Sequence, residues 1–388
     1  MSRILPYLCR ELALPEGFRI SAVMSCFLIL SSLLSSATSD MTVEGSLSFA
    51  QGENKVTSLV LIRNTLYIGM NTVPGMIARV DMISMSKIGS PLRLSEGENS
   101  IYSLLVVGDH LYVGLYTSPG KVVKVSLESF SKVETLTLPD GQNWVSSLAS
   151  SSDFLYAGLR MWPGKIVKID LRTFKEVDLL DLMPEENNIY SMATKDRYLY
   201  AGIAMRPGGV AKIDLEIFRE VESLRFRLGE DYAQPIAISG TLLYAGFYSK
   251  PGGIAKVDLT TFEEVGSGVR FSQEEENVWS LIVHRGSVYA GLDTRPGRVI
   301  RLDLDLKRLA TLSLAEGEDG VYAFAPLDSS LVCGVYSSPG KIVLIRPQEL
   351  TPRSYSFSTI VVAVVLSLLC LTLWALRSRF QRSLTVGK

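Results

Sequence analysis

The sequence has few of the residues on which many enzymes and metal sites depend. Its 388 residues include only two histidines, His110 and His284. Two histidines leave little scope for a metal site with several histidine ligands or for a Ser–His–Asp triad. The charges almost cancel, with 39 Lys and Arg against 40 Asp and Glu. This balance excludes the strongly basic surface of a general nucleic-acid-binding protein.

Cysteine is also scarce in the long central part of the sequence. Of the four cysteines, Cys9 and Cys26 fall near the N-terminus and Cys370 near the C-terminus, which leaves only Cys333 between them. A single cysteine makes no intramolecular disulfide. The central region therefore has to be stabilised by a large hydrophobic core.

Long apolar runs occur only at the two ends of the chain. Near the N-terminus, residues 20–34 read ISAVMSCFLILSSLL, follow three arginines and precede the small residues Ala37-Thr38-Ser39. This run is short for a bilayer span, but its length and flanking residues are typical of a secretory signal peptide. We predict a leader over residues 1–40, with an uncleaved anchor as the alternative.

The second apolar run, residues 357–376, reads FSTIVVAVVLSLLCLTLWAL and contains no charged residue. At about 1.5 Å per residue, a helix of this length crosses a hydrocarbon core of roughly 30 Å. Three arginines follow within the next six residues. The positive-inside rule therefore predicts that the basic tail, residues 377–388, is cytoplasmic.

These two segments predict the placement of the rest of the chain. We expect residues 41–350 to lie outside the cell and residues 351–356 to form a short stem. The single C-terminal helix would then contact the lipid bilayer of the plasma membrane. A buried core helix is the alternative for the apolar segment, but core helices of this length usually carry a polar face.

A repeat of 43 to 45 residues organises the region between the two apolar runs. A Pro-Gly pair occurs seven times, and a Gly precedes each of these prolines by five residues. In six of the seven repeats a Tyr stands two residues before that Gly. The seven prolines are Pro74, Pro119, Pro163, Pro207, Pro251, Pro296 and Pro339.

Each repeat reads as four short strands. In the second repeat we predict them at Ile101–Val107, Leu111–Tyr116, Lys121–Leu127 and Lys132–Leu138, separated by turns rich in Gly, Pro, Asp and Ser. Four strands in about 44 residues are the pattern of a propeller blade. A helical repeat of similar period is excluded because these segments are rich in Val, Tyr and Ile and are broken by Gly and Pro.

The two ends of the repeat region complement each other. The last repeat ends after its third strand, Lys341–Ile345, whereas Ser46–Gly52 matches the fourth-strand segment Thr311–Gly317 of the sixth repeat. We therefore predict that an N-terminal strand completes the seventh blade and removes an open sheet edge. The predicted fold class is all-β: a seven-bladed β-propeller of four-stranded blades, followed by a C-terminal transmembrane helix.

The L-Y-x-G and P-G-x-V-x-K-[VI]-D-L pattern resembles the YVTN/quinoprotein-like group of seven-bladed propellers over about residues 42–347. The resemblance implies the propeller fold and, because many members are secreted or surface-attached, an external location. It implies no particular activity, because the group includes enzymes, binding proteins and surface proteins.

The residues that recur in every repeat have structural interpretations. We expect the Gly and Pro-Gly positions to satisfy turns and close packing, and the repeated Tyr to pack between blades. A Lys or Arg usually stands two residues before an Asp in the third strand, as in Lys168 and Asp170. Because residues i and i+2 share one face of a strand, we expect these pairs to form ion pairs within or between blades.

The residues that differ between repeats predict a binding surface. Strand counting places the links between blades and the P-G loops on one side of the propeller, where the variable positions lie 17 and 3 residues before each Pro. Trp144 and Trp162 fall on the same side, as do acidic and amide residues of the links. The candidate binding residues are Tyr102, Trp144, Tyr190, Trp279, Tyr322, Tyr116, Trp162, Tyr248, Tyr336, Glu98 and Asn99.

Aromatic side chains beside hydrogen-bond acceptors are typical of a surface that binds a protein, a peptide or a glycan. The alternative for the Asn and acidic residues is hydrogen bonding within their own turns. We predict no cofactor. Calcium takes about six to eight oxygen ligands, and it is the one cofactor that the repeated acidic residues could still bind.

The leading hypothesis is a membrane-anchored extracellular propeller that acts as a binding module, without catalysis and without nucleic acid. One alternative is a hydrolase or lyase of the propeller type with an axial site that could hold calcium. The enzyme motifs G-x-S-x-G, H-E-x-x-H and C-x-x-C do not occur. The other alternative is a structural cell-surface protein.

Overall fold

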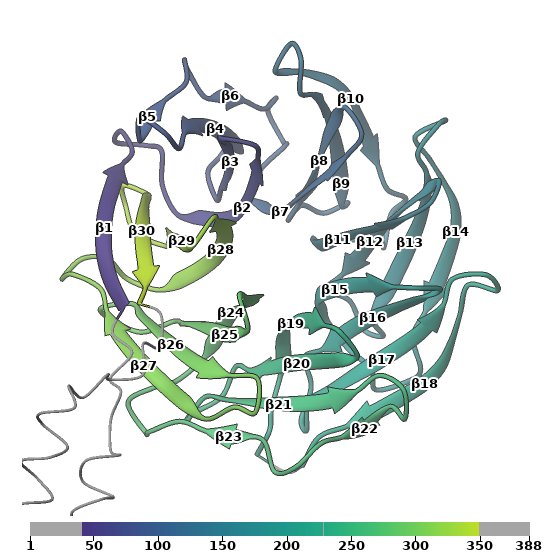
Figure 1. Ribbon diagram of the computed structural model, residues 1–388. Helices are drawn as coiled ribbons and strands as arrows, with labels where there is room; N and C mark the ends of the chain where they lie inside the picture. Colours follow the sequence, from purple (N-terminus) through teal and green to yellow (C-terminus); the bar gives the residue numbers. More distant parts are fainter. Residues whose placement is uncertain (1–40, 228, 349–388) are drawn as a thin grey trace, which may run out of the picture. The chain divides into compact units, whose positions relative to one another are not determined.

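The computed structural model describes residues 41–227 and 229–348, all of whose regular elements are β-strands. The predicted leader, stem, transmembrane helix and basic tail lie outside these residues. In the part that is described, no helix has the length and apolarity needed to cross a bilayer. The strands form seven sheets arranged in a closed ring (Figure 1), which confirms the predicted seven-bladed β-propeller.

Each blade has its first strand innermost and its last strand outermost. Blade 1 comprises β2 (Val56–Ile62), β3 (Thr65–Met70), β4 (Met76–Asp81), β5 (Ser86–Lys87) and β6 (Leu92–Arg93), and blade 2 comprises β7 (Ile101–Val107), β8 (His110–Leu115), β9 (Lys121–Ser126) and β10 (Ser131–Thr137). Blade 3 comprises β11 (Val145–Ser151), β12 (Phe154–Leu159), β13 (Lys165–Asp170) and β14 (Lys175–Asp181), and blade 4 comprises β15 (Ile189–Lys195), β16 (Tyr198–Ile203), β17 (Gly209–Asp214) and β18 (Arg219–Arg225). Blade 5 comprises β19 (Ala233–Ser239), β20 (Leu242–Phe247), β21 (Gly253–Asp258), β22 (Glu263–Glu264) and β23 (Val269–Arg270), and blade 6 comprises β24 (Val278–His284), β25 (Ser287–Leu292), β26 (Arg298–Asp303) and β27 (Arg308–Ser313). Blade 7 comprises β28 (Val321–Leu327), β29 (Ser330–Val335), β30 (Lys341–Pro347) and, as its outermost strand, β1 (Met41–Ser48).

The N-terminal strand closes the ring, as the sequence predicted. β1 pairs antiparallel with β30, from Met41 opposite Pro347 to Ser48 opposite Lys341. In Figure 1 the first described strand and the last one lie side by side, in purple and yellow. Every blade therefore has its fourth strand, and the ends of the repeat region are held by sheet hydrogen bonds.

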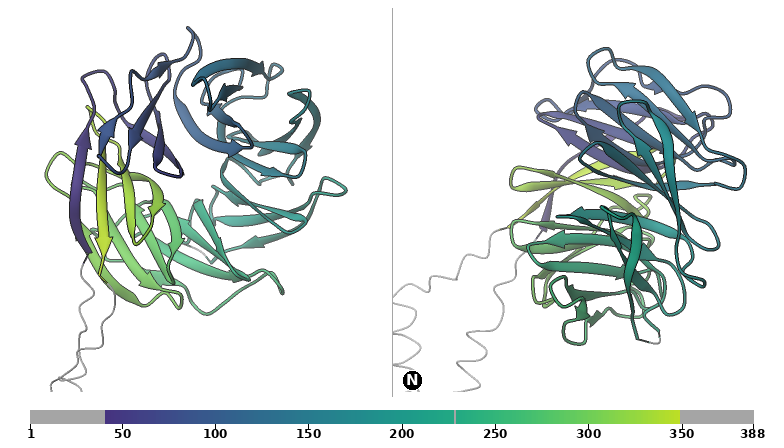
Figure 2. Two further views of the ribbon diagram at one scale, coloured as in Figure 1. Left: turned by 45° about the horizontal axis from the view of Figure 1, so that its top comes forward. Right: turned by 90° about the vertical axis from the view of Figure 1, so that its right-hand side faces the viewer.

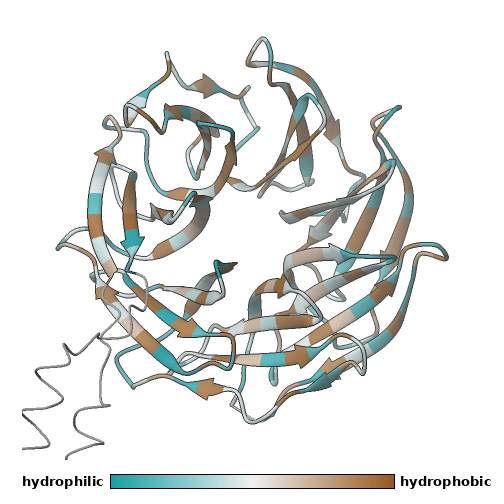
Figure 3. Ribbon diagram, viewed as in Figure 1, coloured by the Kyte–Doolittle hydropathy of each residue, from teal (hydrophilic) through white to brown (hydrophobic). Residues whose placement is uncertain are grey.

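The hydrophobic core lies in the seams, the interfaces between adjacent blades. The repeated Tyr is buried in each seam where it occurs; Tyr156 of blade 3, for example, is 1% exposed and meets Phe218 of blade 4 at 5.9 Å between ring centroids. Tyr112 and Phe174 repeat this contact between blades 2 and 3. The predicted blade-to-blade role of the Tyr is confirmed. Hydrophobic and hydrophilic segments alternate along the outer strands (Figure 3), as one buried and one solvated face require.

The repeated glycines are fixed by close approach between blades. A Cβ at Gly158 of β12 would lie 2.5 Å from Ser147 Oγ in its own blade and 2.7 Å from Ile189 Cγ2 in the next. The Gly of each Pro-Gly pair has a similar restriction: at Gly120 a Cβ would lie 3.0 Å from the Gln142 carbonyl, which accepts the Gly120 N–H. The two glycines of the repeat thus allow neighbouring blades to pack tightly.

The expected ion pair between the repeated cation and the following Asp is not found in blade 3 of the described structure. Lys168 lies over the ring of Phe218 in the next blade, 5.2 Å from its centroid, and so extends the seam. Asp170 instead accepts hydrogen bonds from the backbone and hydroxyl of Thr173 in the turn that follows its strand. Because the strand ends in a turn, backbone N–H groups of that turn lie close to the Asp carboxylate. The carboxylate accepts hydrogen bonds from them in place of an ion pair with the Lys.

One side of the propeller, which we call the loop face, is formed by two sets of segments. In each blade the loop between the second and third strands carries the Pro-Gly pair, preceded by a cis peptide bond. The link to the next blade lies against this loop, and their backbones hydrogen bond; Trp144 N–H, for example, donates to Thr117 O at 2.9 Å. The views in Figure 2 show the blades side by side around the ring. The loops are residues 71–75, 116–120, 160–164, 204–208, 248–252, 293–297 and 336–340, and the links are residues 49–55, 94–100, 138–144, 182–188, 226–227 with 229–232, 271–277 and 314–320.

Candidate functional site

A β-bulge at the start of every innermost strand turns one side chain toward the axis. In blade 2, Ile101 pairs with Leu115 and Ser103 with Gly114, so that Tyr102 is the extra residue between them. A bulge re-aims the side chain of the residue it inserts. The same irregularity occurs in all seven first strands, and in blade 5 it contains two residues, Gln234 and Pro235.

These bulged positions surround a central cavity of about 260 Å³. They are the residues 17 positions before each Pro, so the structure brings together around the axis the set that the repeat singled out. In five blades the cavity is also lined by a Ser next to the bulged residue and by one apolar side chain after it, as by Ser103 and Leu104 in blade 2. The bulged residues are Thr57, Tyr102, Ser146, Tyr190, Gln234, Trp279 and Tyr322.

Where the bulged residue is small, it ties neighbouring blades together. Thr57 Oγ1 donates to the Ile101 carbonyl of the next blade at 2.6 Å, and Ser146 makes the equivalent bond to Ile189. Where it is aromatic, it contributes instead to a cluster at the loop-face end of the cavity. Thr and Ser are therefore structural at this position, whereas the four aromatic residues are available for contact.

One part of the aromatic cluster belongs to blades 5, 6 and 7. Trp279 stacks on Tyr322 at 4.2 Å between ring centroids, and Tyr322 stacks on Tyr336 at 4.1 Å. Tyr248 meets the edge of Trp279 at 5.5 Å. Burial raises the pKa of Tyr322, and a hydrogen bond with Asp293 acts in the same direction. These rings, each partly exposed, form a packed but accessible wall.

The other part of the cluster belongs to blades 2 and 3. Tyr116 stacks on Tyr102 at 4.8 Å and on Trp144 at 5.7 Å. Burial raises the pKa of Tyr102 to about 12. Tyr190 of blade 4 meets the edge of Trp279 of blade 6 at 6.4 Å and so joins the two parts.

Arg160 lies between the two parts of the cluster. Its guanidinium carbon is 3.9 Å from the centroid of Tyr190 and 4.9 Å from that of Tyr116, and it donates a hydrogen bond to the Tyr190 hydroxyl. In the described part of the chain no carboxylate lies within ion-pair distance of Arg160. A guanidinium held by aromatic faces keeps its charge and several N–H donors for other contacts.

Two tryptophans project from the loop face beside Arg160. Trp162 is 78% exposed and Trp144 is 37% exposed. Trp144 also adopts a φ of 60°, an uncommon conformation for a bulky residue; its own N–H donates to the Thr117 carbonyl, and its carbonyl accepts the Arg160 N–H. A recess of about 400 Å³ lies here, lined by Trp144, Arg160, Met161, Trp162 and Asn188.

The charge of the loop face differs between its two halves. In blades 4, 5 and 6 the residue before the Pro is cationic and pairs with an acidic residue in the next link. At the equivalent positions of blades 1, 2 and 3, neutral residues face asparagines; Ser118 Oγ, for example, donates to Asn143 Oδ1 at 2.9 Å. The three ion pairs are Arg206–Asp231, Lys250–Glu276 and Arg295–Asp319.

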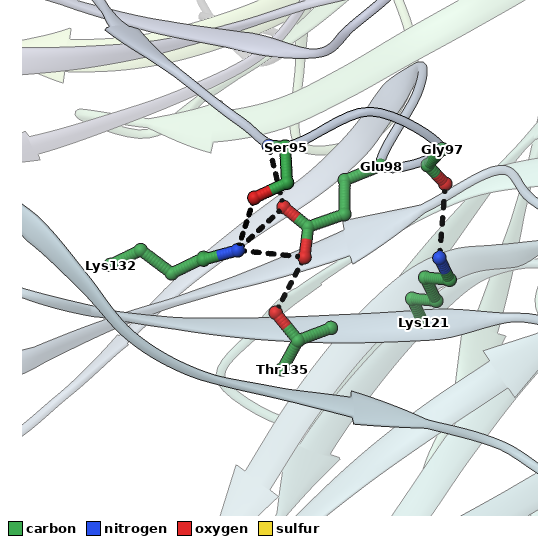
Figure 4. Close-up of polar contacts among 6 residues, drawn as sticks. All are labelled: Ser95, Gly97, Glu98, Lys121, Lys132 and Thr135. Atoms are coloured by element: carbon green, nitrogen blue, oxygen red, sulfur yellow. Dashed lines mark hydrogen bonds and ion pairs between the residues drawn. The ribbon is translucent and has the colours of Figure 1, made fainter.

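Glu98 lies apart from the aromatic cluster. Its carboxylate accepts hydrogen bonds from the Ser95 backbone, from Lys132 at 3.0 Å and from Thr135 at 2.7 Å, the last two on the outermost strand β10 (Figure 4). Glu98 is 5% exposed. Burial alone would raise its pKa, but these bonds lower it. Asn99 is partly exposed, and its buried Oδ1 has no hydrogen-bond partner among the described residues.

The position of Glu98 recurs in the other blades with different partners. In blade 6 Glu275 binds Arg308 through two hydrogen bonds of 2.6 and 2.7 Å; burial would raise the pKa of Glu275, but these bonds lower it to about 2. In blade 4 the partner is Glu220, another carboxyl, beside Glu186. Burial raises the pKa of Glu220 to about 8, and the contact with Glu186 acts in the same direction.

The geometry of this pair indicates one shared proton. Glu186 Oε2 and Glu220 Oε1 are both buried and have no donor among the described residues. The remaining oxygens have partners: Glu186 binds Ser223 and Arg225, and Glu220 Oε2 accepts the N–H of Met183. Two facing carboxyl oxygens without another donor require a proton between them.

Neither histidine belongs to the aromatic cluster. His110 begins β8 and His284 ends β24, both in the hairpin between the first and second strands of a blade. His284 Nε2 lies 3.0 Å from the Asp328 carbonyl. Among residues 41–227 and 229–348, no group of three or more His, Cys, Asp or Glu side chains is placed to hold a metal ion. The acidic residues of the links instead pair with cations, Glu98 and Glu275 with the outermost strand of their own blade and Asp231, Glu276 and Asp319 with the loop of the preceding blade.

Comparison with known proteins supports the propeller fold and no closer relationship. No protein-family model matches the chain, and no curated protein sequence matches it. Solved propeller structures match it in shape, and their sequence identities of 12 to 17% limit the likeness to the fold.

Three of these structures cover most of the chain. The WD40 domain of Pan2 from Neurospora crassa has a TM-score of 0.63 at 12% identity and aligns over 81% of this chain and 98% of its own. A chain of the mitotic checkpoint complex has a TM-score of 0.65 at 17% identity and covers 81% and 94%. The computationally designed protein Ika8 has a TM-score of 0.54 at 14% identity and covers 76% and 98%.

Proposed function

We propose that this protein is a cell-surface interaction module that binds a protein or peptide partner through its loop face. The observation that carries the proposal is the aromatic cluster at the mouth of the central cavity, continued outward by two exposed tryptophans. Exposed Trp, Tyr and Arg side chains are the residues that most often supply the binding energy of a protein interface. Burying Trp162, which is 78% exposed, would offset part of the cost of association.

The fold is compatible with this role. Propellers present long loops from a rigid ring, and the loops vary while the ring is conserved in shape. One of the chains with this fold is a component of a multi-chain assembly, the mitotic checkpoint complex. The proposal includes the predicted location: the propeller outside the cell, anchored by a helix at residues 357–376, with residues 377–388 in the cytoplasm.

Site-specific photo-cross-linking on cells tests the binding face. A photoreactive amino acid replaces Trp162 or Val73 on the loop face, or Ile83 in the hairpin on the opposite side as the control. These three apolar side chains are almost equally exposed, at 78%, 77% and 78%. We expect one discrete protein adduct from the loop-face positions and none from Ile83. Equal adducts from both sides, or none from the loop face, would contradict the proposal.

The same experiment separates a protein from a glycan partner. An adduct that disappears after glycosidase treatment identifies the glycan that the aromatic surface was also predicted to accept. An adduct that keeps its mass identifies a protein. The result therefore decides between the two partner classes.

Protease protection tests the proposed membrane topology. Protease added to intact cells should digest the propeller and leave the basic tail protected, as detected with an antibody to residues 377–388. A propeller that stays intact until the cells are permeabilised would overturn the external location.

A further inference from the structure

The recess beside Trp162 combines apolar walls with a single cation. Trp144, Met161 and Trp162 supply the walls, Asn188 supplies an amide, and Arg160 lines the same space. Its volume of about 400 Å³ is that of a small binding pocket.

The state of Arg160 distinguishes it from the three cations that stand immediately before a Pro. Arg206, Lys250 and Arg295 each have a carboxylate partner from the next link. For Arg160, the described residues provide two aromatic rings and one hydroxyl, and its guanidinium has donors beyond the one used for Tyr190. Arg160 thus holds a positive charge for which the described residues provide no carboxylate partner.

The partner that fits this arrangement carries one negative charge next to an apolar group. A carboxylate matches the planar guanidinium and gains a charge-assisted hydrogen bond. An apolar side chain beside it would cover Trp144 and Trp162. A polyanion is disfavoured, because only one free cation stands among the apolar walls of this recess.

We propose that this recess receives a segment of the partner protein in which an acidic side chain stands next to an aromatic or aliphatic one. The acidic side chain binds Arg160, and the apolar one lies against Trp144 and Trp162. This inference rests on the proposed function, because it names the chemistry of the partner at the same face.

A displayed library of random peptides, fused so that no C-terminus is free, tests the inference on the full chain. We expect the enriched peptides to share Asp or Glu adjacent to an apolar residue. A synthetic capped form of the most enriched peptide should bind about tenfold more tightly than its counterpart with Glu or Asp replaced by the amide, the factor for one charge-assisted hydrogen bond.

Two variants and a control assign the effect to the recess. Arg160→Gln should remove the tenfold preference, and Trp162→Ala should weaken both peptides while leaving the preference in place. Arg295→Gln, which changes a loop-face cation that already has a carboxylate partner, should change neither. Trp162→Ala carries the test if Arg160→Gln lowers the melting temperature, because Trp162 is largely exposed and is not needed for folding.

The outcomes that overturn the inference are distinct from those that overturn the proposed function. Peptides without an acidic residue, a preference that survives Arg160→Gln, or a library that yields no binder would each overturn the inference. Cross-linking from Trp162 and Val73 decides the proposed function separately. A discrete cross-link together with peptides that ignore both variants would leave the interaction module standing and remove only the acidic partner.

Discussion

Tyr156 and Trp162 stand six residues apart in the same hairpin region of blade 3, yet their surroundings are opposite. Tyr156 lies in the seam with blade 4 and is 1% exposed, whereas Trp162 lies on the loop face and is 78% exposed. Tyr recurs at its position in six of seven repeats, while the position of Trp162 holds a different residue type in most of them. In a seam the residue type is restricted, because two blades pack against each other there. On the loop face the residue type can vary from one repeat to the next.

The seven repeats act as an internal comparison. Positions that contact the next blade keep one residue type in most repeats, as Tyr does in six of seven, since every seam has the same geometry. Positions on the loop face differ, but in matched pairs: a cation before the Pro occurs where the next link offers an acid, and a neutral residue where it offers Asn. Positions whose residue repeats therefore indicate packing between blades, and positions whose residue varies indicate the exposed loop face.

The largest effect that separates the two regions is expected from truncating their aromatic residues. Tyr156→Ala should lower the free energy of unfolding by about 4 kcal/mol, because it removes a fully buried ring from a seam. Trp162→Ala should change it by less than about 0.5 kcal/mol, because little is lost from an exposed site. Urea denaturation of the full chain measures both. Similar losses for the two variants would refute the distinction.

A methyl group added to a seam should be the next largest perturbation. Gly158→Ala brings a Cβ to 3.0 Å from Met192 Sδ and closer still to Ser147 and Ile189, an overpacking that costs about 3 kcal/mol. Gly45→Ala in the outermost strand of blade 7 is the matched control, because a Cβ there meets only Met85 at 4.0 Å. Calorimetric melting should show a large shift for the first variant alone. Tolerance of Gly158→Ala would mean that the blades are not held together as tightly as the seams indicate.

The carboxyl pair in blade 4 should make a smaller, pH-dependent contribution. The raised pKa of Glu220, about 8 in the folded protein, means that the folded state binds a proton more tightly than the unfolded one. Stability from this group is present below about pH 4.5 and is lost as the pH rises toward 8. Glu220→Gln supplies an amide donor in place of the shared proton, as Gln142 does toward Glu176 in blade 3.

Measuring unfolding of wild type and Glu220→Gln at several pH values checks this. The two should be equally stable near pH 5, and the variant should be more stable by about 1 kcal/mol near pH 8.5, after allowance for the solvent exposure of the pair. A difference that does not change with pH would exclude the shared proton. The Glu275–Arg308 pair of blade 6 provides the contrast, because its acid pKa of about 2 makes its contribution disappear only in strong acid.

The smallest effect is expected from the ion pairs of the loop face. Arg295→Ser removes a side chain that is 87% exposed and 3.9 Å from Asp319, so stability should fall by no more than about 0.5 kcal/mol. Thermal melting at low and high salt should barely distinguish the variant from wild type. A loss above about 1 kcal/mol would show that the charged half of the loop face is part of the framework.

Several features of the fold and site follow directly from the repeat. Ring closure by β1 can be predicted from the sequence, because Ser46–Gly52 matches the sixth repeat and the last repeat lacks its fourth strand. The ring of side chains at the cavity mouth can also be predicted, because these residues stand at the same distance in sequence, 17 positions, before each Pro. The bulge that aims those side chains inward and the positive φ of Trp144 cannot be predicted from the sequence. The bulge arises in the pairing of β7 with β8, and the backbone of Trp144 is held by a hydrogen bond to Thr117 of the preceding blade.

The amino-acid sequence by itself determined the number of blades, the strands within each blade and the closure of the ring, because alternation, turn residues and repetition are local properties. Only the tertiary structure decided which polar residues are partners. Glu98 and Arg160 look alike in the sequence, as charged residues near the same face, but Glu98 meets Lys132 and Thr135 on the outermost strand, whereas Arg160 meets two aromatic rings and keeps its charge unmatched. That difference arises from contacts between distant segments, which only the packing of blade against blade brings together.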